Sequence, residues 1–84
     1  VLHERLFRFW FPETPGALTR LLEATRGKHN ISLFHYRTQG GDFGRVLIGL
    51  ECPEGKDREL EKRLDALGYR YKEETDNPAY TLFL

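Results

Sequence analysis

The octapeptide Asn30-Ile31-Ser32-Leu33-Phe34-His35-Tyr36-Arg37 decides the fold that we predict for this chain. Its side chains alternate in character as they do in a β-strand, where successive residues point to opposite faces. One face is expected to carry Ile31, Leu33, His35 and Arg37, and the other Ser32, Phe34 and Tyr36. Because both faces carry large apolar side chains, neither is a simple solvent-exposed face. We expect helices to cover one face and a partner or a ligand to cover the other.

The length and composition indicate one globular domain, which we take as residues 1–84. The chain is 39% hydrophobic and 31% charged, as is usual for a folded globular protein. Its 13 basic residues balance its 13 acidic residues, which argues against a nucleic-acid-binding surface or a polybasic membrane patch. No apolar run approaches the roughly 18 residues of a membrane-spanning helix.

The single cysteine, Cys52, cannot form an internal disulfide. We expect it to act as a small buried hydrophobe in a protein of a reducing compartment, the cytoplasm. The chain begins at Val1 and enters a strand pattern at once, so we expect it to be part of a longer protein.

The predicted elements follow the order β-α-β-β-α-β. They are a strand at 4–11, a helix at 15–28, strands at 30–38 and 45–52 joined by a glycine-rich hairpin at 39–44, a helix at 57–67 and a strand at 69–74. This order is that of a ferredoxin-like α+β sandwich, with a mainly antiparallel sheet and two helices on one face. Residues 80–84 are predicted to add a short C-terminal strand.

Local signals support these boundaries. Thr14 is a suitable N-cap, with Pro15 at the first helical position, and Gly68 is expected to end the second helix in a left-handed conformation. Glycines at 40–44 are interpreted as a hairpin and not as a phosphate loop, because they connect two strands and not a strand to a helix.

No catalytic or metal-binding constellation emerges from the pattern. His3, His29 and His35 have no cysteine or carboxylate at zinc-like spacing. The charged helix at 57–67 is interpreted as a solvated face with an i,i+4 ion pair between Glu59 and Arg63, and the acidic residues at 73–76 as a polar edge or turn. Catalytic residues and a metal are therefore not predicted.

An RNA-binding domain of the same topology is a weaker alternative. Residues 41–48 match part of the motif that stacks RNA bases in such domains. However, Arg45 stands where a stacking aromatic residue is needed, and the net charge is zero.

The start of the first helix leaves two interpretations open. A helix N-terminus offers free N–H groups and a partial positive charge, and the small residues Gly16 and Ala17 would let a carboxylate approach. The same small residues would also let the helix pack closely on the sheet.

Several segments resemble the C-terminal regulatory, ACT-like domain of biosynthetic threonine dehydratase (threonine deaminase). Residues 9–18 resemble its F-x-F-P-E-R-P-G-A-L motif, with Thr14 in place of the arginine, and residues 30–37 match its N-I-S-L-F-H-Y-R motif. Residues 67–69 and 74–80 resemble its closing L-G-Y and E-T-N-N-P-A-F motifs. The resemblance implies a single ACT-like regulatory domain.

The resemblance also implies a function. The parent enzyme uses pyridoxal phosphate to convert threonine to 2-oxobutanoate and ammonia on the route to isoleucine. Its catalytic domain lies elsewhere in the protein, so no cofactor is expected in this domain. The regulatory region is expected to sense isoleucine, which inhibits, and valine, which opposes inhibition, in an enzyme that forms homo-oligomers.

We therefore predict an effector site that includes Glu13, Gly16, Ala17, Leu18, Asn30, Ile31, Tyr36 and Arg37. The helix N-terminus would bind the carboxylate, and Glu13, or Asn30 of a second copy, would bind the ammonium. Leu18 and Ile31 would form an apolar wall, whereas Tyr36 and Arg37 would couple the site to the rest of the enzyme. The alternative is an oligomerisation module that binds no ligand. Self-association is expected through a second apolar sheet face with Leu6, Trp10 and Leu47.

Overall fold

The computed structural model of the chain describes residues 2–25, 29–38 and 41–83. In chain order its elements are β1 (Leu2–Pro12), α1 (Ala17–Thr25), β2 (Asn30–Thr38), β3 (Phe43–Pro53), α2 (Asp57–Ala66), β4 (Arg70–Glu73) and the 3₁₀ helix η1 (Pro78–Phe83). The predicted β-α-β-β-α-β order is confirmed.

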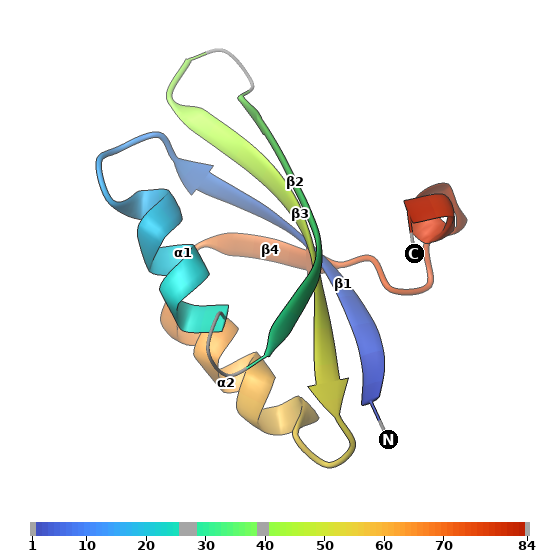
Figure 1. Cartoon of the computed structure of the whole chain (residues 1–84). Coiled ribbons are helices and arrows are strands. Elements are labelled where there is room, and N and C mark those ends of the chain that lie inside the picture. The colour runs from blue at the N-terminus through green and yellow to red at the C-terminus, as the bar shows by residue number, and fades with distance from the viewer. Residues whose placement is uncertain (1, 26–28, 39–40, 84) are drawn as a thin grey trace.

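The four strands form one antiparallel sheet in the order β2-β3-β1-β4. Strands β1 and β3 pair along their whole length, from Leu2 opposite Pro53 to Pro12 opposite Phe43. Both helices lie against the same face of this sheet, as the sequence predicts (Figure 1). The architecture is therefore a ferredoxin-like α+β sandwich.

The core lies between the sheet and the two helices. Strand β1 contributes every second side chain, Phe7, Phe9 and Phe11, and none of the three is more than 2% exposed. The other members are Ala17 and Leu21 of α1, Val46, Ile48, Leu50 and Cys52 of β3, and Leu60 and Leu64 of α2. Because each large buried side chain stabilises the fold by about 1.5–3 kcal/mol, these alternating residues hold the helices on the sheet.

Helix α1 begins at Ala17, two residues later than predicted, because Gly16 has a φ of +85°, which a right-handed helix cannot contain. Pro15 and Gly16 form a turn, and the N–H of Ala17 donates to the carbonyl of Thr14 over 3.1 Å. The prediction that Pro15 occupies the first helical position is wrong. The predicted helix end, at residue 28, lies outside the described residues.

A β-bulge in β2 places Ile31 on a different face from the one predicted. Ile31 lies opposite Leu50 and Leu33 lies opposite Gly49, so Ser32 is an extra residue in the ladder. Ile31 packs against the core on the helix side, whereas Leu33 lies on the other face. The prediction assumed an uninterrupted alternation, which one inserted residue is enough to invert.

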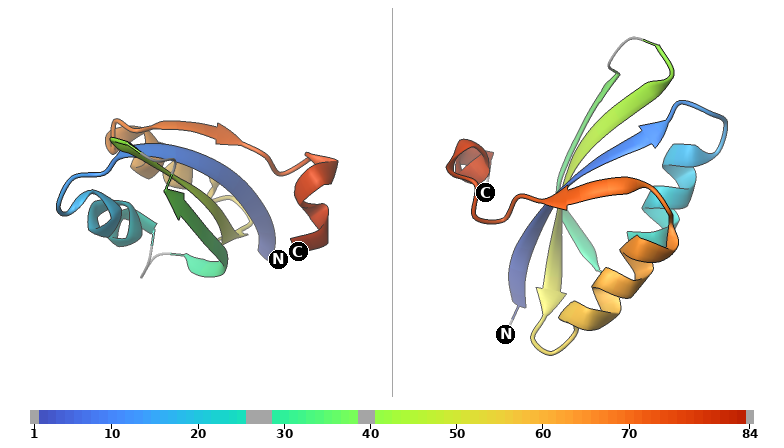
Figure 2. Two further views of the ribbon diagram at one scale, coloured as in Figure 1. Left: turned by 90° about the horizontal axis from the view of Figure 1, so that it is seen from above. Right: turned by 180° about the vertical axis from the view of Figure 1, so that it is seen from behind.

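The prediction of a final strand at residues 80–84 is wrong. The segment Pro78–Phe83 is the 3₁₀ helix η1, and residue 84 lies outside the described residues. Asn77 starts this helix: its Oδ1 accepts the N–H of Ala79 over 2.9 Å and its carbonyl accepts the N–H of Tyr80 over 3.0 Å. Helix η1 lies on the side of the sheet away from α1 and α2 (Figure 2).

The sheet face away from the two helices, called here the outer face, is not the open apolar surface that we predicted. Leu6 is only 1% exposed and Leu47 only 8%. The segment after β4 lies along Leu6, because the N–H of Glu74 donates to the Leu6 carbonyl over 2.7 Å and Thr75 Oγ1 accepts the Leu6 N–H over 3.0 Å. Because Leu6 and Leu47 are buried within a single copy of the chain, the chain itself covers part of this face.

Trp10, the third residue of the predicted apolar surface, is covered by arginines. The guanidinium carbon of Arg8 lies 4.8 Å from the Trp10 ring centroid, and that of Arg70 lies 4.4 Å from it. Both distances are within the range of cation–π attraction. Around Trp10 the outer face therefore presents arginines where an apolar surface was expected.

Candidate functional site

Glu13 and Tyr36 meet at the end of the sheet where β1 leads into α1 and β2 turns into β3. The Tyr36 hydroxyl donates to Oε1 of Glu13 over 2.5 Å. The backbone N–H of Glu13 donates to the Asp42 carbonyl over 2.7 Å, which ties the loop after β1 to the β2–β3 hairpin. A Cβ on Gly44 would lie 2.0 Å from Glu13 Oε1. The carboxylate can therefore occupy this position only because residue 44 has no side chain.

The Glu13 carboxylate favours the protonated form of Tyr36. Its hydrogen bond to the hydroxyl raises the pKa of Tyr36 above the ordinary value, and burial and the negative charge of Glu13 act in the same direction. Tyr36 is protonated at neutral pH, as an ordinary tyrosine is, so its hydroxyl can donate. One carboxylate oxygen of Glu13 accepts this bond, and the other has no hydrogen-bond partner among the described residues.

The turn before α1 presents an open surface with backbone donors. A Cβ on Gly16 would meet nothing within 4 Å. The N–H of Ala17 is used by Thr14, but those of Leu18 and Thr19 have no acceptor among the described residues. The first turn of the helix thus keeps two of its free N–H groups.

Other predicted site residues lie elsewhere. Asn30 and Ile31 are at the opposite end of β2, about 20 Å along the strand from Tyr36, and the amide of Asn30 donates to Glu51 over 3.2 Å. Arg37 follows Tyr36 directly and lies on the outer face. The structure therefore groups Glu13 and Tyr36 with the turn before α1, and separates Asn30, Ile31 and Arg37 from them within one copy of the chain.

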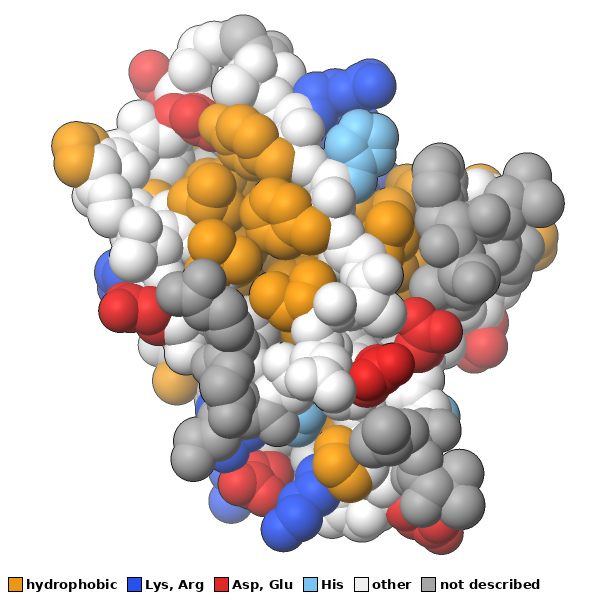
Figure 3. All heavy atoms as spheres, in the orientation of Figure 1, with side chains coloured by type: hydrophobic (Ala, Val, Ile, Leu, Met, Phe, Trp, Pro, Cys, Tyr) orange, Lys and Arg blue, Asp and Glu red, His pale blue; other side chains and the backbone are white. Residues whose placement is uncertain are grey.

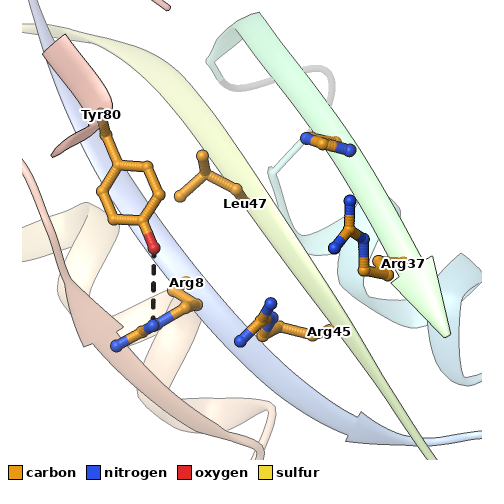
Figure 4. Close-up of a pocket in the computed structure, with 6 residues that line it drawn as sticks. Arg8, Arg37, Arg45, Leu47 and Tyr80 are labelled. Carbon is orange, nitrogen blue, oxygen red and sulfur yellow. Dashed lines mark hydrogen bonds between the residues drawn. The ribbon is translucent and has the colours of Figure 1, made fainter. Parts of the chain in front are cut away.

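Arg37 lines a cavity of about 160 Å³ on the outer face, which we call the arginine cavity (Figure 4). The other lining residues are Arg8 of β1, His35 of β2, Arg45 and Leu47 of β3, and Tyr80 of η1. Arg37 was predicted from the sequence as a site residue, whereas Arg8 and Arg45 were not. The sequence pattern could have identified them, because they alternate with the core residues of β1 and β3 and therefore point to the outer face.

The three arginines of this cavity differ in their partners. Arg8 forms an ion pair of 2.8 Å with Glu74, whose side chain is only 4% exposed, and its Nη1 lies 3.5 Å from the Tyr80 hydroxyl. Arg37 and Arg45 are directly opposite each other on β2 and β3. Neither of them has an ion pair within residues 2–25, 29–38 and 41–83.

A second arginine of β1, Arg5, anchors acidic residues that the sequence analysis placed at a polar edge. It is 8% exposed and holds Glu73 with two hydrogen bonds of 2.9 and 2.7 Å, while its Nη2 donates to Glu61 over 2.9 Å. The hydrogen bonds from Arg5 lower the pKa of Glu73 below its usual value. This network joins β1, β4 and α2.

One histidine has neighbours that could bind a metal ion, which the sequence spacing did not indicate. The potential ligand atoms of His3, Cys52 and Asp57 lie within 4.8 Å of one another, although His3 and Asp57 are 54 positions apart. The Nη1 of Arg5 lies 3.2 Å from the same Asp57 oxygen that contacts His3. Because this guanidinium would compete with a cation, we interpret the cluster as part of the Arg5 network.

Residues 1–84 match the model of a family described as the C-terminal regulatory domain of threonine dehydratase. The chain belongs to this family. The resemblance stated from the sequence motifs is thereby confirmed, and the chain is a regulatory domain of this family.

This regulatory domain has close relatives among threonine dehydratases. It is 57% identical over 83 residues to the L-threonine dehydratase biosynthetic IlvA of Burkholderia multivorans and 51% identical over 83 residues to that of Escherichia coli. It is 48% identical over 84 residues to the mitochondrial threonine dehydratase of Saccharomyces cerevisiae. These matches cover 99%, 99% and 100% of the chain but only 16%, 16% and 15% of the relatives.

Solved structures with a similar fold include a regulatory subunit and an ACT domain. The regulatory subunit of aspartate kinase from Thermus thermophilus superposes with a TM-score of 0.65 at 14% identity, covering 90% of this chain and 54% of that one. The ACT domain of the GTP pyrophosphokinase of Chlorobium tepidum gives 0.63 at 13% identity, covering 87% and 99%. The ACT-like fold is therefore confirmed. Among the described helices, none is both long and apolar enough to cross a membrane.

Proposed function

We propose that this regulatory domain senses branched-chain amino acids and controls a catalytic domain in the same protein. Isoleucine would inhibit and valine would oppose inhibition of the conversion of threonine to 2-oxobutanoate and ammonia. The catalytic domain would carry the pyridoxal phosphate, and the enzyme would act in the cytoplasm as a homo-oligomer. The observation that carries this proposal is the family match along all 84 residues to a regulatory domain.

The group around Glu13 supports an effector site at the turn before α1. An amino acid presents a carboxylate and an ammonium. The free N–H groups of Leu18 and Thr19 suit the first of these, and the unoccupied oxygen of Glu13 suits the second. Leu18 offers an apolar contact. Asn30 and Ile31 would have to come from a second copy of the chain. The effector would then bind at an interface between two copies.

Tyr36 and Arg37 remain our candidates for coupling the effector site to the enzyme. They are consecutive residues on opposite faces of β2, so a shift at Tyr36 would be transmitted through the backbone to the arginine cavity. Tyr36 contacts Glu13 on one side of the sheet. Arg37 lines the cavity on the other side.

The alternative is a domain that fixes the oligomeric state and binds no ligand itself. Phe34, on β2, is 40% exposed, which is high for a large hydrophobic side chain. Figure 3 shows hydrophobic side chains gathered beside α1 on the face of the molecule that this helix partly covers. This surface replaces the outer face as our candidate for self-association. Calorimetric titration with isoleucine and with valine separates the two functions.

The sharpest test of the effector site compares two glycines in the whole enzyme. Gly16 and Gly55 have φ values of +85° and +87°, and an added Cβ meets nothing within 4 Å at either position. The substitutions Gly16→Val and Gly55→Val therefore introduce the same backbone strain, but only the first lies at the proposed site. We expect Gly16→Val to weaken inhibition by isoleucine while threonine turnover persists, and Gly55→Val to leave inhibition unchanged. Equal isoleucine sensitivity in the two folded variants would place the effector elsewhere.

A further inference from the structure

The arginine cavity holds more positive charge than its surroundings neutralise. Guanidinium groups from three strands face it (Figure 4), and the Glu74 carboxylate pairs with only one of them, that of Arg8. Because the whole chain has zero net charge, this excess is a local feature and does not follow from composition. In the part of the chain that the structure describes, Arg37 and Arg45 are left without a carboxylate.

The positions of these two arginines destabilise the sheet when no anion is bound between them. Arg37 and Arg45 are direct cross-strand partners on the outer face. Like charges placed directly opposite each other destabilise a sheet. Trp10, opposite Arg45 on the other neighbouring strand, has cation–π contacts with Arg8 and Arg70 but none with Arg45. An anion between the two guanidinium groups would remove their repulsion.

Arg8, which lines the same cavity, has a hydrogen-bond donor that is unpaired in the described part of the chain. Its Nε is buried and has no hydrogen-bond partner among the described residues. A buried donor without an acceptor destabilises the folded state. Guanidinium groups present several N–H donors in a fixed fork, and carboxylates match this fork in geometry and charge.

We propose that the arginine cavity is a binding site for a small carboxylate with a short apolar tail. The carboxylate lies between Arg37 and Arg45, and the tail lies against Leu47 and the Tyr80 ring. The cavity volume of about 160 Å³ suits a small molecule, since it is several times the roughly 30 Å³ that one water takes in the liquid. This site is on the opposite face from Glu13 and Tyr36 and does not depend on the effectors proposed above.

Titration of the 84-residue chain with sodium butanoate at constant ionic strength tests this site. We expect saturable binding by calorimetry and a rise in the thermal unfolding temperature, whereas butanamide, which has the same tail without the charge, and chloride have neither effect. Arg37→Gln and Arg45→Gln should each weaken binding by about tenfold, which corresponds to roughly 1.4 kcal/mol of charge-assisted hydrogen bonding. Arg70→Gln is the matched control, because Arg70 lies on the same face without lining the cavity.

Stability without ligand separates a binding role from a structural one. Because Arg37 and Arg45 repel each other, Arg45→Gln should raise the unfolding temperature of the free chain and reduce the further rise caused by a given concentration of butanoate. The proposal is wrong if butanoate stabilises no more than chloride, or if Arg45→Gln binds butanoate as tightly as the unmodified chain. It is also wrong if butanoate does not bind but Arg45→Gln changes the oligomeric state, since the cavity would then receive an acidic side chain of another protein surface.

Discussion

The hydroxyl of Tyr36 and the carboxylate of Glu13 join two segments that are 23 residues apart in the sequence, over 2.5 Å. Strand β2 supplies the donor and the loop between β1 and α1 supplies the acceptor. Movement of this loop must therefore either carry Tyr36 with it or break the bond. The pair is a measurable indicator of any change at the turn before α1.

The first prediction concerns the ionisation of Tyr36. The Glu13 carboxylate raises the pKa of Tyr36, so Glu13→Gln should lower that pKa toward its ordinary value. NMR of isotope-labelled tyrosine rings during an alkaline titration measures the change. Tyr71 is the internal control, because burial and Asp65 raise its pKa to about 12 independently of Glu13. An unchanged Tyr36 titration in Glu13→Gln would contradict the assignment.

The second prediction concerns Gly44. A methyl group there would lie 2.0 Å from Glu13 Oε1 and 3.1 Å from Phe11 Cζ. We expect Gly44→Ala to displace the Glu13 side chain and to lower the free energy of unfolding by about 1–3 kcal/mol, as overpacking commonly does. Urea denaturation of both variants and of the double variant measures this. The loss should be smaller in a Glu13→Ala background, and equal losses in the two backgrounds would show that Glu13 is not the obstacle.

The third prediction concerns acid stability. In the folded chain Arg5 holds the pKa of Glu73 below its ordinary value, so the unfolded chain binds more protons once the pH falls through that value. The stabilisation is complete at neutral pH and is lost progressively below about pH 4.3.

Arg5→Gln should therefore destabilise the domain at neutral pH by about 1–2 kcal/mol, since Glu73 is partly exposed. The difference from the unmodified chain should shrink as the pH falls, which urea denaturation at several pH values measures. A difference that stays constant into acid would mean that packing of Arg5, and not its charge, is lost.

The fourth prediction concerns Thr75. Its Oγ1 accepts the backbone N–H of Leu6 over 3.0 Å and donates to Glu73 over 2.6 Å. Thr75→Val leaves the Leu6 N–H without this acceptor and should lower stability by about 1–3 kcal/mol. Thr75→Ser keeps the hydroxyl and should remain near the original stability. Hydrogen exchange at the Leu6 amide should accelerate only in the valine variant, and equal exchange in both would refute the role of this bond.

The element order and the main core could be predicted from the sequence because they depend on local periodicity. The alternation of Phe7, Phe9 and Phe11 is visible in the sequence, and so are the apolar spacings of both helices. Glu13 and Tyr36 were both predicted as site residues, Glu13 to bind the ammonium and Tyr36 to couple the site to the enzyme, but the hydrogen bond between them was not predicted.

The incorrect predictions concern features that are determined by residues distant in sequence but close in space. The bulge at Ser32 depends on how β2 pairs with β3, which the β2 sequence does not reveal. Residues 80–84 resemble a strand in sequence, but the Asn77 cap directs the chain into a 3₁₀ helix. The arginine cavity combines side chains from four elements, so it exists only once the strand register is known.

The arginines of the outer face have a consequence at long range. Arg8, Arg37, Arg45 and Arg70 lie on one side of a chain whose 13 basic and 13 acidic residues cancel. The domain is therefore neutral as a whole but has a cationic region around the arginine cavity. The arginines would attract an acidic molecule in solution to this face before any contact forms. Added salt would weaken this attraction.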